Sequence, residues 1–320
     1  MADDGLTALT ATEAAAEIAR GAVSAEDYVR ACLGRVEALD GGIKAFVHLD
    51  RGHALAQARA LDERRTQGHS LGPLHGIPVA IKDIIDTADY PTELGSPLAA
   101  GRRPRHDATV VARLRAAGAV IIGKSVTTEF AYYHPGPTRN PHDHARTPGG
   151  SSSGSAAAVA ARMVPLALGS QTNGSVIRPA AFCGVFAVKP SHGLVSRAGV
   201  LPLSRKLDHI GAFARSLPDL ALILEVIAGQ DPADPDTGPF AAPDFRAVRG
   251  ARGRARVRGR ARRPSAIVDR SLGSAPHHHG GRHGAQSRPV GRAWRAERSV
   301  TQAPCARQGR ERGRLSRRAG

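Results

Sequence analysis

The sequence has few cysteines, few aromatic residues and no long apolar run. Its three cysteines, Cys32, Cys183 and Cys305, are odd in number and widely spaced, so they lack the paired pattern of a disulfide-stabilised secreted domain. No run of about 18 apolar residues occurs, which leaves no candidate membrane span. The acidic first residues, Met1–Gly5, also lack the basic and apolar segments of a secretion signal. We therefore expect a cytoplasmic chain without a membrane partner.

Excess positive charge is likewise absent from most of the chain. The net charge is +17, yet residues 1–246 hold 25 Lys plus Arg against 25 Asp plus Glu. Residues 247–320 hold 20 arginines, no lysine and only 3 acidic residues. A basic balance attracts nucleic acid or acidic membranes only where the charge lies, so the first segment carries no such indication. The composition predicts a globular segment at 1–246 and a distinct arginine-rich, low-complexity segment at 247–320.

Two interpretations of segment 247–320 stay open. The first is a disordered tail that binds nucleic acid through its charge, although Trp294 is its only aromatic residue and base stacking would be limited. The second is translation of a GC-rich gene in the wrong reading frame, which yields Arg, Gly, Ala, Pro and Ser without Lys. The absence of lysine favours a frameshift near codon 246. A nucleic-acid partner is expected only if the segment is genuine.

Segments with helical and strand periodicity alternate along residues 1–246. Thr10 and Ser24 each precede an acidic residue at capping-box spacing, which predicts two helix starts. A further helix is expected at 107–117, begun by Asp107 and ended by a glycine. Strands separated by helices predict an α/β fold. The other expected elements are a helix at 52–65 and strands at 43–49, 76–81 and 119–122.

Three polar side chains are expected at the carboxyl ends of strands. Lys82 directly follows the apolar strand 76–81. Ser151 precedes a small-residue helix at 154–162 that carries the chain roughly 13 Å away, and a following strand brings it back. Ser175 should therefore lie near Ser151. Ligand sites of open α/β sheets lie at this edge, so the three residues form a candidate site.

Three other motifs have less support from their context. Residues 118–125 match a phosphate-binding loop, but the positions that should form the loop are themselves strand-like. Residues 150–154 match the nucleophile elbow of α/β-hydrolases without the strand that should precede it. His142, Asp143 and His144 are adjacent, with no second cluster at metal-ligand spacing. We expect no nucleotide, no metal and no other cofactor.

These motifs together resemble the amidase signature family. The resemblance rests on Gly76–Asp83, on the Gly/Ser-rich segment Gly149–Ala160 and on Pro165–Ser175. Membership would imply a mixed β-sheet core flanked by helices, with the C-terminal part missing, because family members continue well beyond residue 246. The match covers roughly residues 5–246 and continues through Arg178-Pro179, Cys183-Gly184, Val188–Ser191 and Asp208–Gly211.

The resemblance also assigns a role to each site residue. The catalytic lysine falls on Lys82, the bridging serine in a cis peptide on Ser151, and the acyl-accepting nucleophile on Ser175. It implies hydrolysis of a small-molecule carboxamide to a carboxylate and ammonia or an amine, through an acyl-enzyme and without a metal or cofactor. A homodimer is compatible with this assignment. Supporting roles fall on Ser152 and Ser170, and the oxyanion hole on the main-chain N–H groups of Thr172, Asn173, Gly174 and Ser175.

The lysine must be neutral to act as a base. A free lysine titrates near 10.4, so its pKa has to fall by about 3 units to reach the physiological range. Desolvation beside the apolar side chains of Val79 and Ile81 would lower the pKa of Lys82 in this direction.

Three residues depart from the usual pattern of the family. Gln171 stands where many members have Asp, Asn173 replaces a glycine, and Arg178 arrives one position later than the usual arginine. A buried Asp–Arg interaction is therefore absent or rewired. The variant pattern favours a stand-alone amidase. The alternatives are an inactive truncated amidase fragment and a protein similar to the A subunit of glutamyl-tRNA(Gln) amidotransferase.

Overall fold

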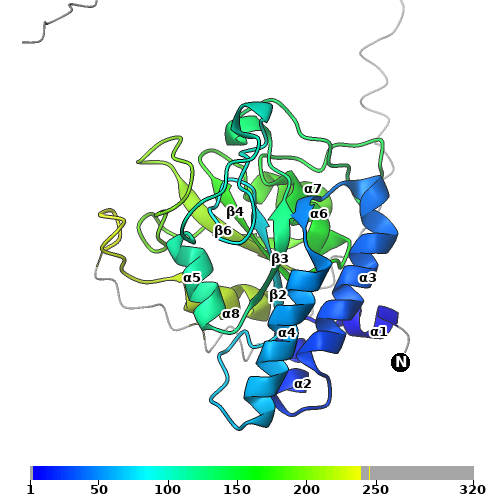
Figure 1. Ribbon diagram of the computed structural model, residues 1–320. Helices are drawn as coiled ribbons and strands as arrows, with labels where there is room; N and C mark the ends of the chain where they lie inside the picture. Colours follow the sequence, from blue (N-terminus) through cyan, green and yellow to red (C-terminus); the bar gives the residue numbers. More distant parts are fainter. Residues whose placement is uncertain (1–2, 239–244, 246–320) are drawn as a thin grey trace, which may run out of the picture. The chain divides into compact units, whose positions relative to one another are not determined.

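The computed structural model describes residues 3–238 and residue 245. Figure 1 shows helices on the flanks of a central sheet, as expected for an α/β fold. Segment 247–320 and the predicted boundary at residue 246 lie outside the described residues, so both stay predictions.

Six strands form one mixed sheet in the order β1-β3-β2-β4-β6-β5. β2 (Pro78–Lys82) runs parallel to β3 (Val120–Ser125) on one side and to β4 (Leu166–Gln171) on the other. Since parallel strands end at the same edge of a sheet, the last residues of β2, β3 and β4 lie together there. The antiparallel strands are β1 (Phe46–Leu49), which pairs with β3, and β6 (His209–Ala214), which pairs with β4 and with β5 (Phe186–Val188).

Every residue of β2, β3 and β4 is buried. This burial accounts for their almost continuous apolar sequences, because parallel strands are usually covered on both faces. Two lysines interrupt the apolar runs, Lys82 at the end of β2 and Lys124 near the end of β3, and both side chains are fully buried. Their amines need hydrogen-bond partners inside the protein.

Eight α-helices and two 3₁₀ helices flank the sheet within the described residues. α6 (Ser153–Ala160) packs against β2, β3 and β4, and α8 (Leu217–Ile227) packs against β5 and β6. α3 (Ala25–Ile43) runs beside α4 (Arg51–Thr66), which contacts β3 (Figure 1). The remaining helices are α1 (Asp3–Ala8), α2 (Ala11–Ala19), α5 (Thr109–Ala116), α7 (Ile177–Cys183), η1 (Pro97–Ala99) and η2 (Glu129–Ala131).

Both capping-box predictions identify true helix starts. Ahead of α2, Thr10 N donates to the Glu13 carboxylate at 2.9 Å, and Glu13 N donates to Thr10 Oγ1 at 3.2 Å. Ahead of α3, Ser24 Oγ accepts from Asp27 N at 2.9 Å. These bonds satisfy N–H groups that have no partner within the helix.

The predicted cap at Asp107 is wrong. α5 begins at Thr109, after Ala108, and has no side-chain cap. The Asp107 carboxylate instead accepts from Ala88 N at 2.8 Å and pairs with Arg115 at 2.9 Å. It therefore fastens a neighbouring loop to α5 rather than beginning the helix.

Candidate active site

Lys82 closes β2 and lies at the centre of the candidate site. Its Nζ donates to Ser151 Oγ at 2.7 Å and to Ser170 Oγ at 2.8 Å. Complete burial lowers the pKa of Lys82 well below its usual value, and the negative charge of Asp208 opposes this effect. A neutral amine in this position can accept a proton from Ser151.

A glycine-rich turn carries Ser151 to this amine. The Gly150–Ser151 peptide bond is cis, as the resemblance implies, and Ser151 O accepts from Thr128 N at 3.1 Å. Gly149 has φ of 75°, and a Cβ there would lie 2.9 Å from the Pro179 backbone. Only glycine fits this backbone conformation and this close approach.

Helix α6 is fastened directly to the strands beneath it. A Cβ on Gly154 would lie 2.2 Å from Ala45 O, so the helix and the neighbouring chain touch at backbone level. At the next residue, Ser155 Oγ lies 2.7 Å from Ser125 Oγ on β3 and donates to Leu168 O on β4 at 2.9 Å. The beginning of α6, and with it Ser151, is thereby held at the edge of the sheet.

Ser175 lies in the turn between β4 and α7, with only 8% of its surface exposed. Its carbonyl accepts from Ser152 N at 3.3 Å, which joins the two serine-bearing turns. Within the described residues, the N–H groups of Asn173, Gly174 and Ser175 donate to no backbone carbonyl. A Cβ on Gly174 would have no neighbour closer than 3.8 Å, so space next to these donors is open.

Ser152 and Ser170 connect the lysine to the helix turn. Ser152 Oγ donates to Ser170 O at 3.2 Å, and Ser170 N lies 3.3 Å from Ser152 Oγ. Ser170 Oγ in turn accepts from Lys82. The structure thus brings Lys82, Ser151, Ser152 and Ser170 into one hydrogen-bonded cluster beside the Ser175 turn.

Asp208 is a site residue for which the sequence predicted no role. Its Oδ1 accepts from Thr172 Oγ1 at 2.5 Å, and its Oδ2 accepts from Leu203 N at 2.8 Å and Ser204 N at 2.7 Å. It belongs to a family-like motif, but its partner Thr172 is 36 positions away. Only the pairing of β4 with β6 brings the two together.

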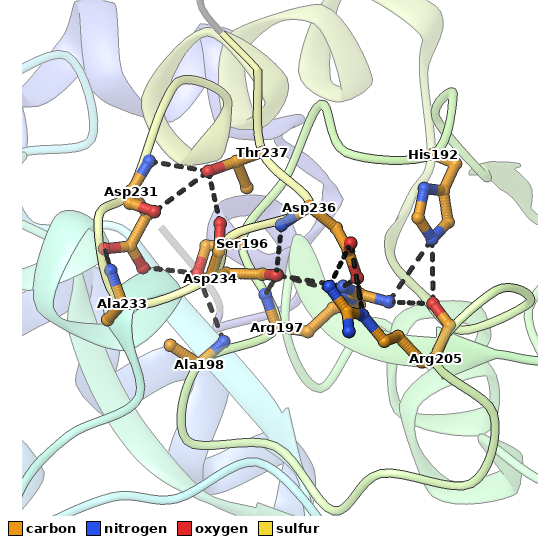
Figure 2. A network of polar contacts seen from close by, with 10 residues as sticks. All are labelled: His192, Ser196, Arg197, Ala198, Arg205, Asp231, Ala233, Asp234, Asp236 and Thr237. Carbon is orange, nitrogen blue, oxygen red and sulfur yellow. Dashed lines mark hydrogen bonds and ion pairs between the residues drawn. The ribbon is translucent and has the colours of Figure 1, made fainter.

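A cavity of about 360 Å³ adjoins the site and is lined in part by Ser170 and Thr172. Figure 2 shows Arg197 and Arg205 converging on Asp236 in its charged wall. Arg205 first, and then Arg197, hold the pKa of Asp236 well below its usual range. These charged side chains pair with one another, so a ligand would contact mainly the apolar wall of the cavity. That wall is formed by Ala198, Val200, Leu201, Pro202, Leu203 and Ile210.

The phosphate-loop motif at 118–125 is not a loop. Most of it is strand β3, and Lys124 Nζ donates to Ile85 O at 2.5 Å, Thr92 Oγ1 at 2.6 Å and Thr87 Oγ1 at 3.3 Å. A fully buried amine with three partners in the protein cannot reach a phosphate.

The histidine-containing loop has structural partners. His142 Nε2 hydrogen-bonds to Cys183 O at 2.8 Å, and Asp143 pairs with Arg146 at 3.0 Å. In the part of the chain that the structure describes, no three His, Cys, Asp or Glu residues are grouped to hold a metal ion. No helix in that same part has the length and apolar character to cross a membrane.

The structure thus joins a buried lysine and two serine-bearing turns at one edge of a mixed α/β sheet. The Amidase family model matches residues 27–257, and the chain belongs to this family.

The curated relatives share close to half of the aligned residues. The chain is 51% identical over 243 residues to the A subunit of glutamyl-tRNA(Gln) amidotransferase from Chloroflexus aurantiacus, covering 74% of this chain and 50% of the relative. It is 50% identical over 232 residues to the same protein from Streptomyces coelicolor, covering 71% and 47%. The chain therefore spans about half the length of the curated relatives it matches.

Solved structures show the same fold. Peptide amidase from Stenotrophomonas maltophilia superposes with a TM-score of 0.70 and 39% identity, covering 74% of this chain and 52% of that one. A structure of 6-aminohexanoate cyclic dimer hydrolase gives a TM-score of 0.68 and 32% identity, covering 75% and 50%. The expected amidase-signature fold, a mixed sheet flanked by helices, is confirmed.

Proposed function

We propose that the chain carries the catalytic apparatus of an amidase that hydrolyses a small-molecule carboxamide through an acyl-enzyme on Ser175. The observation that carries this proposal is the fully buried Lys82 amine, 2.7 Å from Ser151 Oγ. Burial favours the neutral amine, which is the form that can accept a proton. Ser151 relays that proton, and no metal or other cofactor takes part.

The reaction proceeds in two steps, acylation of Ser175 and hydrolysis of the acyl-enzyme. Ser175 Oγ bonds to the amide carbon while its proton passes to Ser151, whose own proton passes to Lys82. The oxyanion accepts hydrogen bonds from the N–H groups of the 172–175 turn. The C–N bond then breaks, and the proton returns through Ser151 to the departing nitrogen. Water attacks the ester by the same route, which releases the carboxylate and restores Ser175.

A fluorophosphonate probe, which phosphorylates activated serines, tests this assignment. We expect labelling of the wild type at Ser175, no labelling of Ser175→Ala, and labelling of Lys82→Met slowed by on the order of 10³-fold or more, because the base is lost. Ser153→Ala is the matched control, since Ser153 is a buried serine of the same segment whose Oγ, among the residues that the structure describes, donates to Val126 O alone, at 3.4 Å. Labelling of Ser175→Ala at the wild-type rate would overturn the proposal.

A second candidate is the A subunit of a glutamyl-tRNA(Gln) amidotransferase, favoured by the 51% identity to the Chloroflexus aurantiacus relative. A preference for glutamine over simple alkyl and aryl carboxamides in an ammonia-release assay would favour this candidate. If the chain is an inactive fragment, the fluorophosphonate probe should not label it, and it should not unfold cooperatively.

A further inference from the structure

Gln171 closes the turn that carries the proposed nucleophile. It is the last residue of β4 and only 7% exposed. Its Oε1 accepts from Val176 N at 2.9 Å and from Ile177 N at 3.0 Å. One side-chain oxygen therefore connects the two ends of the 172–175 turn, on which Ser175 and the oxyanion donors lie.

Arg178 ties the same turn to the turn of Ser151. Its Nε donates to Gly150 O at 3.0 Å, and its own N donates to Gly174 O at 2.8 Å. Within the described residues Arg178 forms no ion pair, so the Asp–Arg interaction usual in the family has no counterpart here. Gln171 and Arg178 each hold backbone of the site instead of holding each other.

We propose that Gln171 and Arg178 are positioning residues that fix the Ser175 turn against the Ser151 turn without adding the negative charge of an acidic side chain at position 171. The proposal rests on the proposed function. An amide oxygen accepts the two N–H groups as a carboxylate would, but it does not repel the negative charge that develops on the substrate oxygen. Gln171 thus accepts both bonds without adding a second carboxylate to that of Asp208, which already binds Thr172 of the turn.

Two substitutions separate the hydrogen bonds from the charge. Gln171→Met has similar volume and cannot accept, so kcat should fall about ten- to hundredfold while KM changes less than about threefold, because the donors lose their alignment. Gln171→Glu can accept but adds charge, so kcat should be near that of the wild type at low pH and fall as the carboxyl ionises. Gln57→Met is the matched control, because Gln57 also hydrogen-bonds to backbone, at Ile121, away from the site.

Arg178 is tested in the same assay. Arg178→Met removes the donor to Gly150 O and should also lower kcat more than it raises KM. Arg178→Lys keeps a positively charged donor, so its kcat should be higher than that of Arg178→Met. If Arg178 acted only by filling space, the two variants should have similar kcat values.

Backbone hydrogen exchange provides a measurement that does not need turnover. Exchange of the Val176 and Ile177 N–H groups should accelerate at least tenfold in Gln171→Met and stay near the wild-type rate in Gln57→Met. Unchanged exchange, unchanged kcat, or an equal loss in Gln57→Met would each overturn the positioning role. Absence of Ser175 labelling in the wild type would overturn the proposed function alone, and the exchange rates would still decide whether Gln171 holds the turn.

Discussion

Two buried lysines on neighbouring strands illustrate how the immediate partners of an amine decide its use. Lys82 donates to two hydroxyl groups, and a hydroxyl can pass a proton onward. Lys124 donates to the carbonyl of Ile85 and to the hydroxyl groups of Thr87 and Thr92, in the loop that follows β2. Both amines have a pKa lowered by burial, but of the two it is Lys82 that donates to Ser151, the proposed proton relay to Ser175.

Asp208 is the carboxylate whose charge acts on Lys82, and it favours the protonated amine. Asp208→Asn should therefore lower the pKa of Lys82 further, because a negative charge near the amine is removed. The acidic limb of the kcat/KM profile, where the base becomes protonated, should move to lower pH. A pH–rate profile of the wild type and the variant measures the shift.

The control for this prediction is Thr172→Val. It removes the hydrogen bond from Thr172 Oγ1 to Asp208 but keeps the charge of Asp208. This variant should lose rate without moving the acidic limb. An acidic limb that stays in place in Asp208→Asn would show that Asp208 acts on the turn alone.

Among the secondary-structure elements, β2 and β3 are joined through the loop that follows Lys82. Lys124 on β3 holds Ile85, Thr87 and Thr92 of that loop, and burial lowers its pKa to about 8. The usual lysine value is 10.5. Between these two pH values the unfolded chain binds a proton that the folded protein has released, so stability rises with pH through this window.

Lys124→Met should remove this rise. The free energy of unfolding of the wild type, relative to the variant, should increase by about 3 kcal/mol between pH 8 and 10.5, because each pK unit corresponds to about 1.4 kcal/mol. Urea unfolding at several pH values provides the measurement. Lys206→Met, at an exposed lysine, is the control and should follow the wild type. Equal slopes in Lys124→Met and the wild type would contradict the assignment.

The sequence predicted those elements whose signals are local. The helix starts at Thr10 and Ser24 and the position of Lys82 at the end of a strand followed from capping and from apolar runs. The cap at Asp107 failed because tertiary partners, Ala88 and Arg115, compete for its carboxylate. The sequence likewise could not predict the hydrogen-bond partners of Gln171 and Asp208, because these depend on the geometry of the turn and on the pairing of β4 with β6.

At the scale of the whole molecule, the chain matches about half the length of its relatives. Apolar side chains next to the site are half exposed, including Ile177 at 47% and Phe182 at 50%, both on α7. Phe182 lies against Gly149, beside the turn of Ser151. Apolar surface in this position is typical of a face that another protein segment covers.

We predict that joining residues 1–246 to the second half of the Chloroflexus aurantiacus relative increases amide turnover by about a hundredfold over residues 1–246 alone. The added half would bury the exposed face of α7 and complete the walls around the substrate. Ammonia release measures the effect, and the same fusion carrying Ser175→Ala is the control. Equal turnover by the two proteins would show that the first half is sufficient.

The central position of β2 has a consequence for the lifetime of the site. β2 is hydrogen-bonded to β3 on one side and to β4 on the other, so fraying of the outer strands β1 and β5 leaves Lys82 in place. Local opening in a protein begins at edges and loops and reaches interior strands last. Lys82, the proposed proton acceptor, thus lies in the part of the sheet that opens last, while Ser175, the proposed nucleophile, lies on a turn at the edge of the sheet. Partial unfolding would displace Ser175 before it exposed Lys82. The proposed amide hydrolysis would therefore stop before water reached the Lys82 amine.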